Sequence, residues 1–310
     1  MRFSQTPTRG QRDRRVAAVI CFSLHTALIT VFSVWAVGCT GIAEVNGDGD
    51  DDIQTDGNPE PTELLDPDAP PITEGDWYRP MVETTWQWQL QPNADGGINT
   101  TYDVEVYDID LFDASDSVIA ELHGSGRKVI CYFSAGSYED FRDDAGEFLA
   151  YDLGNTLEGF ADERWLDIRS GNVQRIMLER LDLAVRRGCD GVEPDNVDGF
   201  SNDAGFNLTA TDQLAYNRFL ANEAHERNLA VALKNDLDQI AELVDYFDFS
   251  VNEQCHEFDE CDALQPFIDA GKPVFNAEYA DPFVDDANAR ADLCADALGR
   301  SFRTLVLPLD

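Results

Sequence analysis

From residue 76 onward, the chain alternates between two patterns of hydrophobic and polar positions. Short runs rich in β-branched and aromatic residues, typical of strands, are separated by segments with apolar residues at helical spacing. Strands that alternate with helices form βα units, and such units build a parallel sheet. Eight strands are predicted, at residues 84–91, 103–110, 128–136, 190–195, 229–235, 247–253, 273–279 and 303–309.

Two connecting segments carry clear helix signals. Thr209 and Asp212 have the spacing of a capping box ahead of the fifth strand, and Gly188 is suited to end a helix before the fourth. Four apolar residues precede Gly188 at helical spacing: Val173, Met177, Leu181 and Val185.

Eight such units predict an α/β fold, a single-domain (β/α)8 barrel over residues 76–310. A doubly wound open sheet is disfavoured because no G-x-G-x-x-G motif follows the first strand. The connection after that strand, PNADGGINTT, is short for a crossover helix.

The first 38 residues have the order of an export signal, with an arginine cluster followed by an apolar run over 16–38. The run ends in AVGC, which resembles the lipobox of bacterial lipoproteins and marks Cys39 for lipidation. We therefore predict a cell envelope lipoprotein of a bacterium, held to the membrane by an N-terminal lipid. Secretion, or an uncleaved N-terminal anchor, is the alternative, because the run is long enough to cross a membrane.

Residues 39–75 are predicted to be a disordered, acidic tether. The part from Glu44 to Gly75 holds 11 acidic residues, no Lys or Arg, and many Gly and Pro, so it has little apolar surface to bury. Its DGDGDD-like start could suggest calcium, but Ile53 stands where an EF-hand loop needs glycine. A solvated spacer is favoured.

The charge balance excludes a surface that follows nucleic-acid phosphates. The chain has 22 Lys and Arg against 60 Asp and Glu, a net charge of −38. Setting aside the +4 of the signal and the −11 of the tether leaves −31 on residues 76–310. The predicted barrel is itself strongly anionic.

Seven cysteines become five when Cys21 and Cys39 are assigned to the signal and the lipidation site. Cys255 and Cys261 bracket HEFDE and could close a short disulfide loop in an oxidising compartment. The remaining three, whose pairing stays open, are Cys131, Cys189 and Cys294. No cysteine or histidine spacing predicts a metal site.

A barrel places its active groups at the C-terminal ends of its strands. Glu193 and Asp195 share one face of the fourth strand, and Pro194 between them is predicted to end regular pairing there. Glu253 ends the sixth strand, across the barrel. Two carboxylates that face each other over a pocket are what glycosidic cleavage requires. The structural alternative is that these acids are helix caps or loop ion pairs.

Six motifs, in order, resemble glycoside hydrolase family 114, the endo-α-1,4-polygalactosaminidase-like barrels: VICYFSAGSYEDFR, RWLDIRS, GCDGVEPDNVDGF, ALKND, VNEQCHEFDECDAL and PVFNAEY. The resemblance implies hydrolysis of an α-1,4-linked galactosamine-rich polysaccharide without a cofactor, with Asp195 as nucleophile and Glu253 as acid/base. The final RTLVLPLD fits the family less well. Residues at the strand ends that would bind substrate are Trp88, Asp108, Tyr132, Ser134, Glu193, Asn196, Lys234, Asn252 and Glu278.

Two other functions were weighed against hydrolysis. A non-catalytic carbohydrate-binding lipoprotein is disfavoured because a binder has no use for a crossing carboxylate pair. A polymer deacetylase is disfavoured because no metal triad is evident. De-N-acetylated galactosamine carries an ammonium group, so an anionic barrel would concentrate such a polycation as its substrate.

Overall fold

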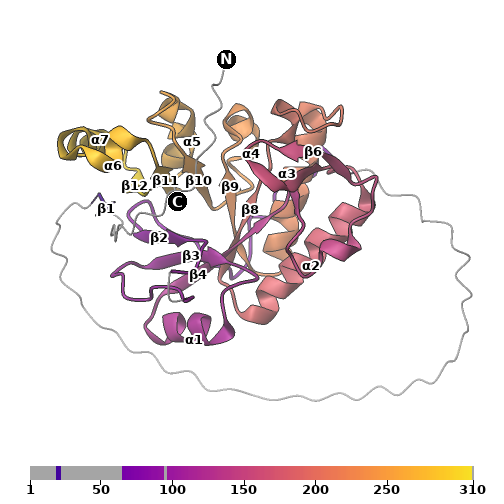
Figure 1. Cartoon of the computed structure of the whole chain (residues 1–310), viewed down its shortest axis with the longest axis horizontal. Helices are drawn as coiled ribbons and strands as arrows, with labels where there is room; N and C mark the ends of the chain where they lie inside the picture. The colour runs from indigo at the N-terminus through magenta and orange to yellow at the C-terminus, as the bar shows by residue number, and fades with distance from the viewer. Residues whose placement is uncertain (1–18, 22–64, 94–95, 309–310) are drawn as a thin grey trace, which may run out of the picture.

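The computed structural model describes residues 19–21, 65–93 and 96–308. Eight parallel strands curve into a barrel, each within its predicted range, and they pair in chain order (Figure 1). The prediction of a (β/α)8 barrel is therefore confirmed. The strands are β2 (Trp86–Gln89), β3 (Val106–Asp110), β4 (Lys128–Ser134), β8 (Gly191–Asp195), β9 (Ala230–Lys234), β10 (Phe249–Glu253), β11 (Val274–Glu278) and β12 (Arg303–Val306).

Helices of very different length surround the strands. In Figure 1 the long helices α2 and α3 lie side by side near β8, whereas α6 and α7 pack at the β12 end. The described residues between β2 and β3 contain no helix, as the short first connection predicts. The α-helices are α1 (Asp116–Gly124), α2 (Gly171–Arg187), α3 (Ala210–Glu226), α4 (Ile240–Leu243), α5 (Gln265–Asp269), α6 (Asp281–Asp285) and α7 (Ala287–Gly299). Short 3-10 helices are η1 (Ala145–Glu147), η2 (Gly199–Ser201), η3 (Leu237–Gln239) and η4 (Cys261–Leu264).

The helix start predicted at Thr209 and the helix end predicted at Gly188 are both present in the structure. The Thr209 side chain accepts from the Asp212 backbone, and the Asp212 side chain accepts from the Thr209 backbone, so the capping box begins α3. Gly188 ends α2 with a φ of 81°, in the left-handed region that favours glycine. Of the four apolar residues at helical spacing in α2, Val185 is exposed.

The lower part of the barrel lumen is filled with apolar side chains. Trp86 stacks on Phe275 with ring centroids 4.8 Å apart, and its indole N–H donates to the Arg303 carbonyl at 2.6 Å, which links β2 to β12. Phe249 and Val251 belong to the same cluster. Because strand side chains alternate, this inward pair directs Glu253 inward as well. Above this packed floor, the C-terminal strand ends present polar groups to the lumen.

Pro194 interrupts strand pairing on one side of β8 only. The register with β4 continues through Pro194 to Asp195, which lies opposite Ser134, whereas the register with β9 stops at Val192. The prediction that pairing ends at Pro194 is therefore wrong on the β4 side. Proline lacks a donor but keeps its carbonyl, so it is tolerated where only an acceptor is needed.

A three-stranded antiparallel sheet follows β4 and was not predicted. It consists of β5 (Ser137–Glu139), β7 (Phe160–Leu166) and β6 (Leu153–Leu157), with β7 in the centre. Its order 5-7-6 and its irregular β6 register give no simple alternation of polar and apolar residues.

The folded domain begins before the predicted boundary at residue 76. Residues 65–75 lie in the described part of the chain and contact α3 and its surroundings. His225 Nδ1 lies 2.8 Å from the Ile72 carbonyl, and the Tyr246 hydroxyl donates to the Ala69 carbonyl at 2.5 Å. The end of the predicted tether is thus part of the domain, because its Pro and Ile residues supply backbone acceptors and apolar cover. The rest of that prediction lies outside the described residues.

Three disulfides join the described cysteines. Cys131 pairs with Cys189 across β4 and β8, and Cys255 pairs with Cys261. Cys21 pairs with Cys294 of α7, beside β1 (Val19–Ile20), which runs antiparallel to β12. Assigning Cys21 to the signal alone was therefore wrong for this structure, because a pairing across so much sequence is decided only by the fold. Cys39 lies outside the described residues.

Among the described residues, no helix combines the length and the apolar character needed to cross a membrane.

Candidate active site

Lys234 lies at the centre of the charged groups at the C-terminal ends of the strands. Its Nζ is 3.0 Å from Glu193 Oε1, 3.2 Å from Asp195 Oδ1 and 3.4 Å from Glu253 Oε2. The structure thus brings together three acids from β8 and β10 through one ammonium group from β9. Trp88 and Tyr132 cover this ammonium, with ring centroids 4.8 and 5.7 Å away.

The charge on Lys234 is retained despite complete burial. Burial alone would lower its pKa, but Asp195, Glu193 and Glu253 raise it well above the ordinary value. Three carboxylates around one ammonium leave the site with surplus negative charge. Such a site favours a cationic ligand over an anionic one.

Asp195 is held at the rim of the barrel by its neighbours. Its Oδ2 accepts from the Tyr132 hydroxyl at 2.9 Å, and its Oδ1 accepts from the Asn196 backbone at 2.7 Å. Asn196 has a φ of 60°, and its amide donates to Ser134 Oγ at 2.9 Å. A Cβ at Gly136 would come within 1.7 Å of the Asn196 carbonyl, so only glycine allows this approach. The Asp195 side chain keeps 17% exposure.

Ser134 was predicted to bind substrate, but the structure places it behind Asp195. It is fully buried and shares its hydroxyl with Ser137 Oγ at 2.7 Å and with the Asn196 amide. Its role in this geometry is to hold the turn that carries Asn196.

Glu253 ends β10 and stays accessible, with 28% of its side chain exposed. Its Oε1 accepts from the Tyr279 hydroxyl at 2.7 Å, and its backbone N–H donates to Asn235 Oδ1 at 3.0 Å. Asn235 and Asp236 have φ values of 48° and 44°, so a tight turn after Lys234 directs the Asn235 amide to Glu253. Sequence reasoning missed Tyr279, although its parity with Phe275 placed it on the lumen side.

Glu193 and Asp108 form the floor of the site rather than its rim. Glu193 Oε2 accepts from the Trp88 indole at 2.9 Å, and both acids are completely buried. Burial first, and then the neighbouring acid charge, raises the pKa of Asp108 well above its ordinary value. Burial likewise raises the pKa of Glu193, partly offset by Lys234. A side-chain hydrogen bond joins Asp108 to Glu193, and two acids can form one only when a proton lies between them.

Asn252 and Glu278 lie on the opposite strand face from the charged centre. Asn252 donates to Asn235 Oδ1 at 3.2 Å, so it supports the turn beside Glu253. Glu278 was predicted to bind substrate; the structure directs it away from the charged centre, where its Oε1 accepts from the His256 backbone at 2.9 Å and lies 3.0 Å from His256 Nδ1. The inward position at this end of β11 belongs to Ala277 and then to Tyr279.

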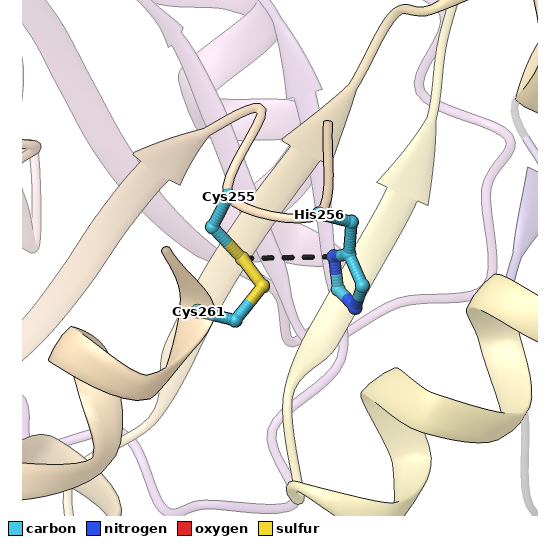
Figure 2. A group of neighbouring side chains, drawn as sticks. All are labelled: Cys255, His256 and Cys261. Atoms are coloured by element: carbon cyan, nitrogen blue, oxygen red, sulfur yellow. Dashed lines mark hydrogen bonds between the residues drawn. A yellow bond between two sulfur atoms is a disulfide. The ribbon is translucent and has the colours of Figure 1, made fainter. Parts of the chain in front are cut away.

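The loop that follows Glu253 is closed by the Cys255–Cys261 disulfide, with His256 beside it (Figure 2). Cys255 Sγ lies 3.6 Å from His256 Nδ1. The three side chains are close enough to share a metal ion, but the two sulfurs are bonded to each other and offer no thiolate. This cluster therefore holds the loop rather than a metal.

The arrangement is suited to acid/base and nucleophilic chemistry at a glycosidic bond. Asp195 and Glu253 come from non-adjacent strands, both remain accessible, and both contact the same ammonium. One partly exposed carboxylate can attack or activate water while the other donates a proton. An acidic pair at the ends of β8 and β10 is the arrangement expected of a (β/α)8 glycosidase.

The chain belongs to glycoside hydrolase family GH114, whose model matches residues 67–310, and it is a glycoside hydrolase. It is similar to Ega3 of Aspergillus fumigatus, solved in complex with galactosamine: 45% identity over 75% of this chain and 94% of that one, with a TM-score of 0.70. The glycoside hydrolase domain of PelA from Pseudomonas aeruginosa shares the fold, at 15% identity over 73% and 94% of the two chains and a TM-score of 0.55. The comparison with curated protein sequences gave no match.

Proposed function

We propose that this protein is an exported endo-glycosidase that hydrolyses α-1,4-linked galactosamine-rich polysaccharide, with Asp195 as nucleophile and Glu253 as acid/base. The observation that carries the proposal is the pairing of these two accessible carboxylates with one buried Lys234. The 45% identity to Ega3, which was solved with galactosamine, supports the choice of sugar.

In the first step, Asp195 attacks the anomeric carbon as the glycosidic C–O bond breaks, and Glu253 gives its proton to the leaving oxygen. The result is a glycosyl ester on Asp195 and a free reducing-end fragment. In the second step, Glu253 takes a proton from water, the hydroxide attacks the anomeric carbon, and Asp195 leaves as a carboxylate. The sugar is thus released with its anomeric configuration retained.

The spacing through Lys234 supports retention. Asp195 Oδ1 and Glu253 Oε2 lie 3.2 and 3.4 Å from the same Nζ. The distance between these two oxygens therefore cannot exceed the sum of those two distances. This limit reaches only the lower edge of the separations typical of inverting enzymes, about 6.5–9.5 Å.

The substrate proposed is cationic, at least in part. The chain has a net charge of −38, and Lys234 is outnumbered by the acids that surround it. A galactosamine with a free amine carries a positive charge that this field attracts.

The proposed function is tested by release of reducing ends from a partly deacetylated, α-1,4-linked galactosamine-rich polysaccharide. Asp195→Asn and Glu253→Gln should each lose activity by at least about a thousandfold, since each removes a group that takes part in bond cleavage. Azide should restore turnover to a nucleophile variant and give the glycosyl azide. Unchanged release by both variants would remove Asp195 and Glu253 from the mechanism, and no release by the unmodified protein would leave a carbohydrate-binding role in place of the enzyme.

Export, followed by attachment to the membrane, is part of the proposal. Three disulfides suit an oxidising compartment, and the sequence AVGC supports a lipid on Cys39. The Cys21–Cys294 disulfide instead supports an uncleaved chain whose residue 21 lies on the exported side, because cleavage before Cys39 would remove Cys21 and a membrane span over 16–38 would keep it from the barrel. The intact mass of the membrane-extracted chain distinguishes the two: a diacylated chain that begins at residue 39 or a full-length chain with six oxidised cysteines.

A further inference from the structure

The turn that follows β4 holds the backbone of Asp195. The N–H groups of Ala135 and Gly136 both donate to the Asp195 carbonyl, at 2.8 and 3.0 Å. Ser134, the last residue of β4, lies opposite Asp195 in the strand register. The position of the Asp195 backbone therefore depends on where residues 134–136 lie.

Strand pairing does not hold this turn on the side of β3. The register between β3 and β4 ends at Asp110 and Tyr132, so Ser134 and Ala135 lie beyond it. Both residues are completely buried, and buried backbone carbonyls require donors. Here the donors are side chains from α2 and α3, the long helices beside β8 (Figure 1).

Arg180 of α2 supplies the donor for the Ser134 carbonyl. Its Nη1 lies 2.6 Å from that oxygen, and only 1% of the side chain is exposed. The ring centroids of Phe112 and Phe148 lie 5.1 and 5.6 Å from the guanidinium carbon. Nε and Nη2 donate to the two carboxylate oxygens of Asp144 at 2.8 and 2.9 Å. Because a guanidinium group is planar, this paired contact fixes the direction in which Nη1 points.

Tyr216 of α3 supplies the donor for the Ala135 carbonyl. Its hydroxyl lies 2.6 Å from that oxygen, and the side chain is completely buried. Burial raises the pKa of Tyr216, so the hydroxyl keeps its proton and acts as a donor. Two neighbouring carbonyls of one turn are thus held by two different helices.

Packing alone does not account for a buried arginine in α2. The buried face of this helix also contains four apolar residues, Val173, Ile176, Met177 and Leu181. Their contacts are enough to dock the helix against the sheet, whereas a buried guanidinium loses hydration that its partners must offset. Arg180 is directed at the turn beside Asp195, where placement of the backbone affects the proposed reaction.

We infer that Arg180 and Tyr216 are positioning residues for Asp195. They fix the turn after β4, and the N–H groups of that turn fix the Asp195 backbone. The inference rests on the proposed function, in which Asp195 attacks the anomeric carbon. A nucleophile reacts fast only when it is held close to its target and in the right direction. Loosening the turn should therefore slow formation of the glycosyl ester and leave substrate binding unchanged.

Tyr216→Phe removes one hydroxyl and keeps the ring. It should lower kcat on the polysaccharide by about tenfold, with little change in KM. A second measurement follows the ester itself, with the 5-fluoro glycosyl fluoride of an α-1,4-galactosamine disaccharide as the probe. Fluoride leaves as the bond from Asp195 to the anomeric carbon forms, and the mass of the enzyme rises by the glycosyl group. The rate of this rise should also fall by about tenfold.

Tyr107→Phe is the matched control. Tyr107 is buried, and its hydroxyl donates to a backbone carbonyl, that of Tyr102, at 2.8 Å. Tyr102 precedes β3, at the end of the barrel away from Asp195. The control should lose a similar amount of stability in urea unfolding and keep both kcat and the rate of ester formation. Equal losses of kcat in Tyr107→Phe and Tyr216→Phe would overturn the inference, because activity would then follow stability.

Chemical rescue tests Arg180. Its side chain lines a cavity of about 280 Å³ together with residues that include Asp143, Glu147 and Arg186, all of them exposed. A small solute can therefore reach the space that Arg180→Ala opens. The variant should lower kcat by about tenfold or more, and ethylguanidinium chloride should restore part of it. Ethylammonium chloride, which has the charge without the planar donors, should not.

The remaining outcomes overturn the inference in distinguishable ways. Circular dichroism identifies a folded Arg180→Ala variant, and failure of ethylguanidinium to raise its kcat would remove Arg180 from the inference. Where Arg180→Ala does not fold, Tyr216→Phe decides. Unchanged kcat in Tyr216→Phe would overturn the positioning role and leave Asp195 as the nucleophile, and so would a rise in KM alone. If the unmodified protein releases no reducing ends and forms no ester with the fluoride, the proposed function fails and this inference fails with it.

Discussion

Tyr279, one residue beyond β11, donates its hydroxyl to Glu253 Oε1 at 2.7 Å. The hydrogen bond fixes one oxygen of the proposed acid/base, and Asn235 and Lys234 approach the other. Tyr279 also stacks beside Trp88, with ring centroids 6.5 Å apart, so both its ring and its hydroxyl are positioned.

Tyr279→Phe should lower kcat by about tenfold, because it removes one hydrogen bond to a group that changes its protonation during the reaction. The ring stays, so KM and folding should change little. Steady-state kinetics at several pH values provide the measurement, with kcat lowered in the variant. A normal pH profile with normal kcat would contradict the positioning role. Tyr78→Phe, on a tyrosine outside the site, is the control.

Lys234→Met should reduce both activity and stability. The substitution leaves Glu193, Asp195 and Glu253 without the ammonium that pairs them, and removing one partner of a buried ion pair costs about 3–5 kcal/mol. Urea unfolding measures the free energy of unfolding. Lys128→Met is the control, since Lys128 is partly exposed and its ion pair with Asp190 contributes about 0–1 kcal/mol. Similar losses for the two variants would contradict the central role of Lys234.

Glu278→Ala should lower the free energy of unfolding by about 1–3 kcal/mol while KM for the polysaccharide stays the same. Glu278 is buried outside the barrel lumen, where it accepts from the His256 backbone, and it does not face the charged centre. Glu278→Gln keeps an acceptor and should retain more of the stability. A rise in KM without loss of stability would return Glu278 to the substrate-binding residues.

Asp236 should make the protein less stable as the pH rises from about 4 to about 8. Its pKa is raised by burial and by Asp198 to about 8, so the folded state holds a proton that the unfolded chain has already released. Stability from this group is present in acid and is lost through that window. Asp236→Asn removes the effect, so its free energy of unfolding, measured against pH, should fall less steeply. A parallel curve for both proteins would contradict the shift.

Salt should weaken activity on the deacetylated polymer much more than on the fully acetylated one. The attraction between an anionic site and a polycation is screened as the Debye length falls, whereas stacking and hydrogen bonds are not. Initial rates at increasing sodium chloride, with both polymers, provide the test. Equal salt sensitivity would count against a cationic substrate.

The sequence predicted most of the barrel because local patterns are enough to mark strands and helices. Alternation placed Glu193, Asp195 and Glu253 on the lumen side, and the capping box and Gly188 marked helix ends that the structure keeps. The same alternation argued against Glu278 and for Tyr279. Both lie at the end of the predicted strand 273–279. The acid was preferred to the tyrosine as a site residue, although alternation puts only the tyrosine on the lumen side.

Other features depend on contacts between segments far apart in the chain. Nothing local shows that residues 65–75 pack on α3, that β5, β6 and β7 pair in the order 5-7-6, or that Cys21 meets Cys294. Each arises because burial and pairing partners are chosen only when the whole domain is assembled.

By itself the sequence determined the alternation of strands and helices, the surplus of acid and the two carboxylates at the strand ends, because these are properties of neighbouring residues. Only the tertiary structure decided that Lys234 lies between those carboxylates and that Tyr279 holds one of them. The curvature of the barrel brings the ends of distant strands within a few ångströms, and no spacing along the chain encodes that closure directly.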